Sequence, residues 1–355
     1  MAKVEEQRGK IDKIDEEIVA LLGKRLSLAL KIGNEKKNSN ESVYDPAREE
    51  EVIARLKNSA KGFPKDGIEK IYREIFSISR RAQQKIKIAY LGPSATFTHF
   101  AALAHFGSAS DFLPFDSIEH VFRAVEKGEA DFGVVPIENS LGGSVTYTYD
   151  MFMNSDLNII AELSEKIEHN LISKYRIKDI EKIYSHQMAI LQCGEWIAKN
   201  LPSAQIIEVA STSKSAESAK LYINSAGIGS ELAARQNGLN IVARSIQDRG
   251  NNITRFLVIG KAPAKKPQDA KTSILFTTKN IAGALLGALE PLRENGISMM
   301  KIESRPSKIK NWDYVFFVDF KGFVEDEGVQ KALEEMKKNT GFLKILGSYP
   351  QMSEK

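Results

Sequence analysis

The first pattern with chemical potential is a set of cations on an otherwise apolar helical stripe. Steps of three and four residues from Arg8 trace a heptad-like seam, which predicts a face packed against a partner helix. A buried charge without a partner is expensive, so each cation must reach solvent, pair with acids such as Asp15, or bind an anionic ligand. The seam comprises Arg8, Ile11, Asp15, Ile18, Leu22, Arg25, Ala29, Ile32 and Lys36, widened by Ile14, Leu21 and Leu28.

Two further helices carry polar groups on faces that should point inward. The pair Asp45-Pro46 predicts an N-cap followed by a proline at the first helical position. A third helix, predicted from Ile68 to about Ile86, interrupts its apolar stripe with a hydroxyl and an amide. The polar groups on these faces are Asp45, Arg48, Glu49, Ser79 and Gln83. With the cations they could line a small cavity suited to a dicarboxylate that also carries hydroxyl and ether oxygens.

A second pattern places polar groups where buried strands begin or end. In "GNNITRFLVIG" (250–260) Thr254 and Arg255 stand at the mouth of a short apolar strand, where a plain polar turn would use similar residues. Open α/β sheets bind ligands at such ends, and helix N-termini opened by Ser or Thr attract anions. The groups so placed are Thr96, Glu138, Asn139, Ser140, Ser185, Gln192, Ser211, Thr212, Thr254 and Arg255. We expect one anion-binding cleft between two subdomains, although simple strand-to-loop caps are the alternative.

The elements that must position these groups fall into segments of different texture. Residues 1–84 contain no strand-like run and predict an all-helical domain. Residues 86–262 alternate β runs with helical stretches, which predicts a largely parallel α/β sheet; the runs are IKIAYLG, DFGVVPI, LNIIAEL, KIYSH, QIIEVAS, LNIVAR and RFLVIG. Residues 263–271 are rich in Pro, Lys and Ala and predict a linker. Residues 272–350 follow the order βαββαβ, typical of an α+β ferredoxin-like sandwich.

Composition excludes several classes of protein. The net charge is +4 and the cations are scattered, so nucleic-acid binding is not expected. The single cysteine, Cys193, forms no intrachain disulfide and fits a reducing compartment, and no apolar run approaches the ~18 residues that cross a bilayer. The N-terminus is charged and lacks an apolar core segment, so we expect a cytoplasmic protein without membrane association. The five histidines are dispersed, which argues against a metal site.

The spacing Arg8…Arg25…Lys36…Asp45-x-x-Arg48-Glu49…Ser79-x-x-x-Gln83 resembles the all-helical chorismate mutase family, with every polar position of its motif present. The resemblance implies the rearrangement of chorismate to prephenate, which needs no protein nucleophile. By it, Arg8 and Arg25 hold the two carboxylates, and Lys36 and Gln83 donate to the breaking ether.

The same resemblance assigns the remaining polar groups and an oligomeric state. Asp45 and Glu49 would hold the ring hydroxyl or support Arg48, with Ser79 assisting. In this family the first helix spans two subunits and Arg8 serves the partner's site. The resemblance therefore implies a homodimer or a higher homo-oligomer.

The central segment resembles prephenate dehydratase through its Thr-Arg-Phe (254–256) and Pro-Ile-Glu-Asn-Ser (136–140) signatures. The implied reaction removes the ring carboxylate of prephenate as carbon dioxide and expels the ring hydroxyl, giving phenylpyruvate. Thr254 would donate to the departing hydroxyl, Arg255 would serve a carboxylate or support the site, and Phe256 would pack beneath it. The expected substrate contacts are Thr96, Glu138, Asn139, Ser140, Ser185, Gln192, Ser211 and Thr212. Three departures from the family pattern, at Ala95, Gln187-Met188 and Ala210, affect its outer shell.

The last segment resembles the amino-acid-binding ACT domain attached to prephenate dehydratases. The resemblance rests on Gly283-Ala284-Leu285 and Glu303-Ser304-Arg305-Pro306, which plain packing could also explain. It implies that L-phenylalanine binds there, at a subunit interface, and inhibits the dehydratase.

The leading hypothesis is therefore a bifunctional enzyme of phenylalanine biosynthesis, an isomerase and a lyase, for which we expect no cofactor. One alternative is a monofunctional prephenate dehydratase whose N-terminal helices are regulatory. The other is a non-catalytic amino-acid or dicarboxylate sensor, which would have no use for a proton donor such as Thr254.

Overall fold

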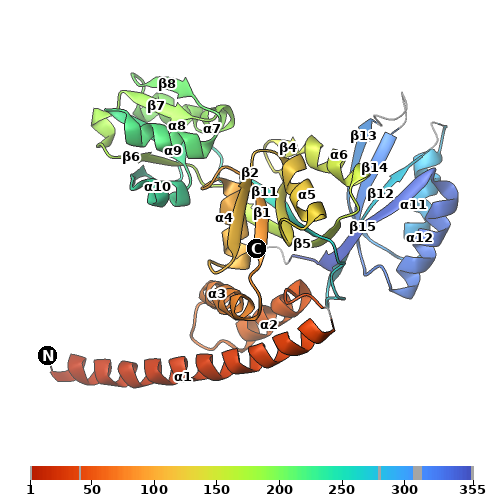
Figure 1. The fold of residues 1–355 in the computed structure, drawn as a ribbon. Coiled ribbons are helices and arrows are strands. Elements are labelled where there is room, and N and C mark those ends of the chain that lie inside the picture. Colours follow the sequence, from red (N-terminus) through yellow and green to blue (C-terminus); the bar gives the residue numbers. More distant parts are fainter. Residues whose placement is uncertain (1, 40, 279–280, 307–313, 353–355) are drawn as a thin grey trace.

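The computed structural model describes residues 2–39, 41–278, 281–306 and 314–352 (Figure 1). Three helices form one end of the molecule: α1 (Ala2–Asn38), α2 (Pro46–Ser59) and α3 (Lys65–Gln83). The predicted cap is confirmed, since the Asp45 carboxylate accepts the backbone N–H of Arg48 at 3.0 Å. The third helix was predicted to reach Ile86, but it ends at Gln83 because Gln84 is extended and β1 begins at Lys87.

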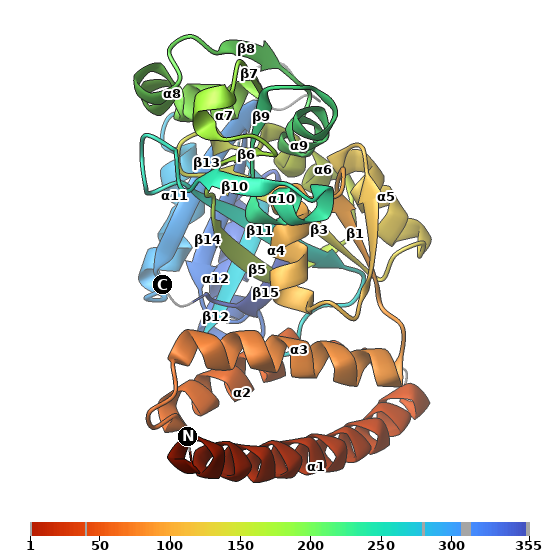
Figure 2. The same cartoon turned by 90° about the vertical axis from the view of Figure 1, so that its left-hand side faces the viewer.

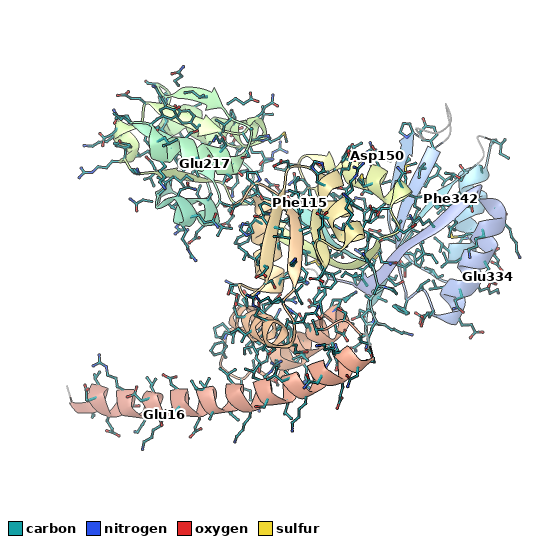
Figure 3. The ribbon with its side chains drawn as sticks, in the orientation of Figure 1. Glu16, Phe115, Asp150, Glu217, Glu334 and Phe342 are labelled. Carbon is teal, nitrogen blue, oxygen red and sulfur yellow. The ribbon has the colours of Figure 1, made fainter. Side chains whose placement is uncertain are left out.

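The long helix α1 runs past the rest of the chain in Figure 1, and Figure 2 shows it beneath α2 and α3. Its side chains, Glu16 among them, project freely over much of its length (Figure 3). Within the described chain the seam lacks the partner helix expected for it: Ile11 is 55% exposed and Leu28 60%.

The first lobe of the central unit is a mixed sheet in the order β2-β1-β3-β11-β5, with β4 beside β3. β1 pairs in parallel with β2 and β3, whereas β11 is antiparallel to β3 and β5. The strands are β1 (Lys87–Leu91), β2 (Asp111–Phe115), β3 (Phe132–Asn139), β4 (Gly143–Ser144), β5 (Asn158–Lys166) and β11 (Ile253–Gly260). The helices are α4 (Phe97–Phe106), α5 (Ile118–Lys127) and α6 (Thr146–Asn154).

The second lobe lies between β5 and β11 in the sequence, so the chain crosses between the lobes twice. Its sheet has the order β10-β6-β9-β7-β8. The strands are β6 (Asn170–Ser173), β7 (Lys182–Ser185), β8 (Gln205–Glu208), β9 (Ser225–Gly229) and β10 (Asn240–Ala243). The helices are α7 (Gln187–Gln192), α8 (Gly194–Asn200), α9 (Thr212–Leu221) and α10 (Glu231–Asn237), with a short 3-10 turn at Ile177–Asp179.

The expectation of a largely parallel sheet is wrong, because both lobes have mixed sheets. Four strands were also missed: β2, the two-residue β4, β6 and β9. β6 has only four residues, and β2 contains a proline, which lowers its strand signal. β9 has the sequence SAGIG, a poor strand former by propensity. Tertiary packing selects it, since a Cβ on Gly227 would lie 2.6 Å from the carbonyl oxygen of Ser215 in α9.

The C-terminal segment is the predicted ferredoxin-like sandwich. Its antiparallel sheet has the order β13-β14-β12-β15 and its chain order is βαββαβ. β12 begins at Ala270, so the last two residues of the predicted linker 263–271 belong to it. The elements are β12 (Ala270–Thr277), α11 (Ala284–Glu294), β13 (Met299–Pro306), β14 (Tyr314–Lys321), α12 (Glu327–Asn339) and β15 (Phe342–Pro350).

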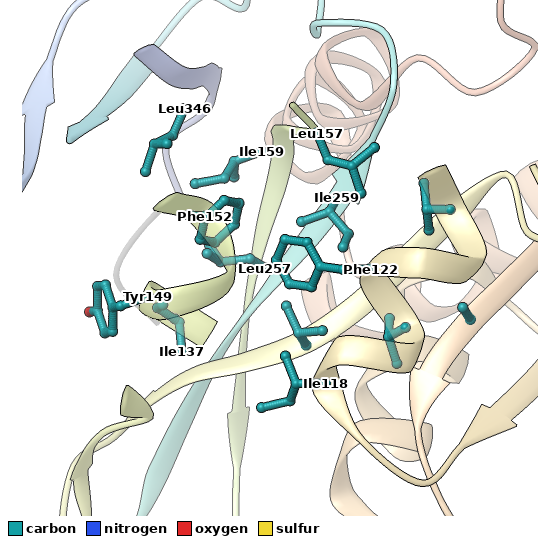
Figure 4. Close-up of a cluster of buried hydrophobic side chains, with 14 of the residues drawn as sticks. Ile118, Phe122, Ile137, Tyr149, Phe152, Leu157, Ile159, Leu257, Ile259 and Leu346 are labelled. Atoms are coloured by element: carbon teal, nitrogen blue, oxygen red, sulfur yellow. The ribbon is translucent and has the colours of Figure 1, made fainter. Parts of the chain in front are cut away.

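One hydrophobic core joins the first lobe to the C-terminal sheet. Leu257 and Ile259 of β11 belong to the same buried cluster as Leu346 of the sandwich (Figure 4). Phe317 of the sandwich is also a member of this cluster. The rings of Tyr149 and Phe317 meet edge to face with centroids 4.6 Å apart. The sandwich is therefore packed against the central unit rather than tethered to it. Among the described residues, no helix is long and apolar enough to cross a membrane.

Two candidate active sites and a candidate effector site

A cavity of about 540 Å³ opens between α1, α2 and α3. It gathers groups that the sequence predicted to meet, namely Arg25, Lys36, Asp45, Arg48, Glu49, Ser79 and Gln83. Apolar side chains such as Leu28, Ile32 and Val52 complete the wall. The cations in this lining are Arg25 and Lys36 of α1, Arg48 and Arg55 of α2 and Arg80 of α3, so the space between the helices can hold a small dianion.

Short contacts order the polar wall of this cavity. Arg25 Nη1 donates to Ser79 Oγ at 2.9 Å, and that hydroxyl donates to the Ile75 carbonyl at 2.7 Å. Gln83 donates through Nε2 to the Ser79 carbonyl at 3.0 Å. Lys36 donates to the carbonyl of Ser42 at 3.0 Å. Among the described residues, Arg25 and Lys36 donate to neutral acceptors, which leaves their charge available to an anionic ligand, whereas Arg48 pairs with Glu51 at 2.7 Å.

Glu49 is held from the side of the bundle that packs against the first lobe. Its carboxylate pairs with Arg80, and Arg73 Nη1 lies 3.9 Å from its second oxygen. Arg80 also donates to the backbone carbonyl of Phe106, the last residue of α4, at 2.6 Å. Burial raises the pKa of Glu49 and the charge of Arg80 opposes that rise. Arg80 follows Ser79 directly but was not among the predicted site residues.

Arg8 does not reach the cavity of its own chain. It lies 17 residues before Arg25 on one helix, roughly 25 Å along its axis at 1.5 Å per residue. Its side chain is 69% exposed and pairs with Glu5 at 3.5 Å.

A second cavity, of about 390 Å³, lies between the two lobes of the central unit. The predicted residues that line it are Thr96, Asn139, Gln192, Ser211, Thr212, Thr254 and Phe256. His169 and Asn252 also line this cavity. They were not predicted, because single polar residues in the crossovers between lobes give no pattern. Ala210 and Met188, two of the departures from the family pattern, also line this cleft.

Helix N-termini replace cations in this cleft. Thr96 caps α4 by accepting the N–H of His99 at 3.3 Å, and Ser211 caps α9 by accepting that of Lys214 at 3.0 Å. Neither Lys nor Arg is among the lining residues. Two ten-residue helices therefore direct the positive ends of their dipoles toward any carboxylate bound between the lobes.

An amide network holds Thr254 in the cleft. Asn139 Nδ2 donates to Thr254 Oγ1 at 2.8 Å and to Asn252 Oδ1 at 2.7 Å. Asn252 in turn donates to Gln192 Oε1 at 2.8 Å. Because the Thr254 oxygen accepts from Asn139, its own hydrogen is free to be donated elsewhere.

Glu138 and Arg255 lie outside this cleft. Thr254 pairs with Asn139 in the sheet and Arg255 pairs with Glu138, so alternation puts the first pair on one face and the second pair on the other. Arg255 bonds Glu162 at 2.7 Å and Asp319 of β14 at 2.5 Å, while Lys301 of β13 lies 2.5 Å from Glu138. A direct substrate contact does not fit this placement, whereas support of the strand does.

Two predicted hydroxyls also miss the cleft lining. Ser185 is fully buried and donates to the His186 carbonyl at 3.3 Å. Ser140 donates to the Asn251 carbonyl at 2.9 Å and accepts the N–H of Ile253 at 3.0 Å. Both are local ties, the second of which fixes the turn before Thr254.

Ala95 stands where the family pattern usually has a glycine. Its φ is 64°, in the left-handed region that favours glycine, so the turn keeps the glycine-like conformation without the glycine.

The two predicted effector motifs meet at one end of the C-terminal sheet. Gly283 has φ 80° and precedes Ala284 and Leu285 at the start of α11. Residues Glu303, Ser304, Arg305 and Pro306 close β13, and the register through β14 puts Arg305 at the same end as Thr277, where β12 leads into α11. Arg305 also donates to Thr146 of α6 at 2.8 Å.

These features define a class: a three-part chain with a cation-lined cavity in a helical bundle, a two-lobed α/β cleft and an appended ferredoxin-like domain. Family models match in that order: chorismate mutase type II over residues 7–84, prephenate dehydratase over 88–264 and the ACT domain over 272–337. The chain belongs to the bifunctional chorismate mutase/prephenate dehydratase family, as the sequence resemblance indicated.

Relatives of that name align along the whole chain. The protein from Aquifex aeolicus (strain VF5) is 50% identical over 357 residues, covering 99% of each chain. That from Neisseria gonorrhoeae (strain ATCC 700825 / FA 1090) is 40% identical, covering 97% of this chain and 96% of the relative. A solved prephenate dehydratase from Arthrobacter aurescens, in complex with L-Phe, is 31% identical with a TM-score of 0.69, covering 75% of this chain and 90% of its own.

Proposed function

We propose that this chain converts chorismate to prephenate in the helical cavity and prephenate to phenylpyruvate in the two-lobed cleft. The observation that carries the proposal is that one fold gathers most of each predicted set of polar groups around a cavity of its own. L-Phenylalanine is the proposed effector, bound near Gly283–Leu285 and Glu303–Pro306. The single, buried Cys193 suits the reducing conditions of the cytoplasm.

In the mutase reaction the protein binds and polarises rather than forming a bond to substrate. Arg25 and the partner subunit's Arg8 would hold the two carboxylates in the compact conformer. Lys36 and Gln83 would donate to the ether oxygen, where charge develops as the bond breaks. Asp45 caps α2 and Glu49 pairs with Arg80, so these two acids support the cavity wall and the neighbouring Arg48.

In the dehydratase reaction the helix N-termini at Thr96 and Ser211 would bind the substrate carboxylates, with Thr212 beside them. Thr254 would donate its free hydrogen to the ring hydroxyl. Asn139 bonds the Thr254 side chain directly, and Gln192 supports it through Asn252. Phe256 packs beneath. Glu138 and Arg255 would act from the far side of the sheet by fixing β3 and β11.

The exposed apolar stripe of α1 and the distance of Arg8 from its own cavity support a homodimer. A second copy of α1 would cover residues such as Ile11 and Leu28 and bring Arg8 to the neighbouring cavity. This arrangement accounts for a helix far longer than α2 and α3 can bury.

Assays of purified protein with chorismate and with prephenate test the proposal. We expect chorismate to disappear and phenylpyruvate to form from either substrate. Failure to make phenylpyruvate from prephenate would reject the dehydratase, and a protein inert to both would be a sensor. Phenylpyruvate from prephenate without chorismate consumption would leave a monofunctional dehydratase with regulatory helices.

A further inference from the structure

His169 lies at the first crossover between the lobes, after β5 and before β6, and lines the dehydratase cleft. It is 4% exposed. The cleft lining contains no Asp, Glu, Lys or Arg, and its titratable side chains are His169 and His186. His186 uses Nδ1 to accept the N–H of Met188 at 3.3 Å and cap α7. The cleft therefore holds an unassigned imidazole in a site that must handle a proton.

The amide network fixes which nitrogen of His169 carries the hydrogen. Asn139 Oδ1 accepts two backbone N–H groups of the following turn, at 3.0 and 2.8 Å, so its other terminal atom is the NH₂ group. That group donates to the Asn252 oxygen, and Asn252 then presents its own NH₂ to Gln192 Oε1. His169 Nε2 lies 2.8 Å from the same Gln192 oxygen, which only accepts. Nε2 therefore bears the hydrogen.

The other ring nitrogen is left without a partner. His169 Nδ1 is buried and has no hydrogen-bond partner in the described part of the chain. An unpaired buried polar atom is costly, and a catalytic role is one explanation for keeping it. Phe97 of α4 packs edge-on against the ring, with centroids 5.5 Å apart, and fixes its orientation.

We propose that His169 is the general acid of the dehydratase reaction, taking up a proton at Nδ1 when dianionic prephenate binds and giving it to the departing ring hydroxyl. The inference rests on the proposed dehydratase function of this cleft. Thr254 keeps its role as a hydrogen-bond donor to the same oxygen, because an alcohol is too weakly acidic to be the net proton source.

The step balances in atoms and electrons. The bond between the ring and its carboxylate breaks, and its electron pair moves into the ring as carbon dioxide leaves. The ring C–O bond breaks, and the hydroxyl departs with the His169 proton as water. Each turnover consumes one proton, which neutral His169 takes up from solvent when the next substrate binds.

The groups around His169 allow a bound substrate to change the protonation state of its ring. Burial lowers its pKa, and the hydrogen bond to Gln192 opposes this, so the ring is neutral in the free enzyme at pH 7. Gln247 in the returning crossover accepts the backbone N–H of His169 at 3.0 Å, and the adjacent Lys166 and Glu168 pair with each other at 2.8 Å. With no recorded ion pair to His169, a bound dianion is the dominant charge and favours the imidazolium.

Substitutions that separate the two ring nitrogens test the proposal in the full chain. The amide of His169→Gln falls near Nε2 and can keep the bond to Gln192, whereas that of His169→Asn falls near Nδ1 and cannot titrate. We expect both to lower kcat for phenylpyruvate formation by about 10²-fold or more, the usual contribution of a general acid. Chorismate consumption should stay at the wild-type rate in the same preparation, which shows that the protein is folded. His120→Gln, on the exposed surface of α5, is the matched control.

The pH profile gives a second readout. The acid form is the active one and its free-enzyme pKa is lowered, so kcat/KM should fall as pH rises through a limb below about pH 6.5. His169→Gln should lack that limb. A His169→Gln enzyme within threefold of the wild-type kcat, or with the limb intact, would overturn the proposal and leave His169 as a support for Gln192. If the wild-type protein itself makes no phenylpyruvate, the proposed function falls, and this inference with it.

Discussion

Two adjacent residues of β11 have separate tasks because a strand alternates its faces. Thr254 faces the cleft with Asn139, whereas Arg255 faces the C-terminal domain with Glu138. Sequence alone could predict that this strand end carries function, since hydroxyl, guanidinium and amides crowd a buried strand mouth. It could not predict which residue faces the substrate, because that depends on the packing of the C-terminal sheet against the other face.

Replacing Thr254 with valine keeps the shape of the side chain and removes the hydroxyl. We expect Thr254→Val to lose phenylpyruvate formation by about 10²-fold or more, because no other group takes over its hydrogen bond. Chorismate consumption should be unchanged, since the mutase cavity is formed by α1, α2 and α3 and not by β11. Equal loss of both activities, measured in one preparation, would show that Thr254 holds the fold rather than the substrate.

Helix α1 leaves room for the side chain of Gln83 by carrying a glycine, Gly33, at the point of contact. Gly33 lies where a Cβ would be 2.5 Å from the side chain of Gln83, so the two helices meet closely at that point. The seam of cations was readable because a heptad pattern is local. The contact between Gly33 and Gln83 could not be predicted, because the sequence of α1 does not indicate which residue of another helix lies opposite Gly33.

Gly33→Ala should therefore displace Gln83 from the ether oxygen. We expect mutase kcat to drop by about tenfold or more, since small misplacements of a catalytic group are costly, while dehydratase activity is retained. Gly23→Ala on the same helix is the control, because a Cβ there meets nothing within 4 Å in the chain. Identical mutase rates for both variants would show that Gln83 adapts and that its position is not critical.

At the scale of the whole molecule, the proposed mutase site would take one of its arginines, Arg8, from a second chain. A mixed population of Arg8→Ala and Arg25→Ala protomers tests this directly. If Arg8 serves the partner, each mixed dimer regains one intact cavity, and random mixing restores about a quarter of the wild-type sites. If Arg8 acts within its own chain, every cavity lacks one arginine and mixing restores nothing. Mutase rates before and after co-refolding give the answer.

The junction between the helical bundle and the first lobe makes stability depend on pH. Burial lowers the pKa of His105, and Arg73 and Arg80 lower it further; its ring bonds the Tyr44 hydroxyl. The folded pKa thus lies below the unfolded value of about 6.5, so the unfolded chain binds more protons as pH falls. The free energy of unfolding should be full above about pH 6.5 and decrease below it.

Urea unfolding at pH 7.5 and pH 5.5, at fixed protein concentration, measures this change. His105→Gln should be less stable at pH 7.5 but lose less on acidification than the wild type. An equal loss in both proteins would assign the pH dependence to other groups.

Helix α4 connects the two chemistries through its two ends. Thr96 opens it at the dehydratase cleft, and the carbonyl of Phe106 closes it on Arg80, which holds Glu49 in the mutase cavity. Cutting the chain after Gln83 to obtain two separate catalysts would remove the acceptor of a buried guanidinium and expose the Tyr44–Phe106 contact, whose ring centroids lie 5.0 Å apart. Anyone who wishes to harvest the mutase as a stand-alone module must therefore redesign that surface, not merely choose a cleavage point.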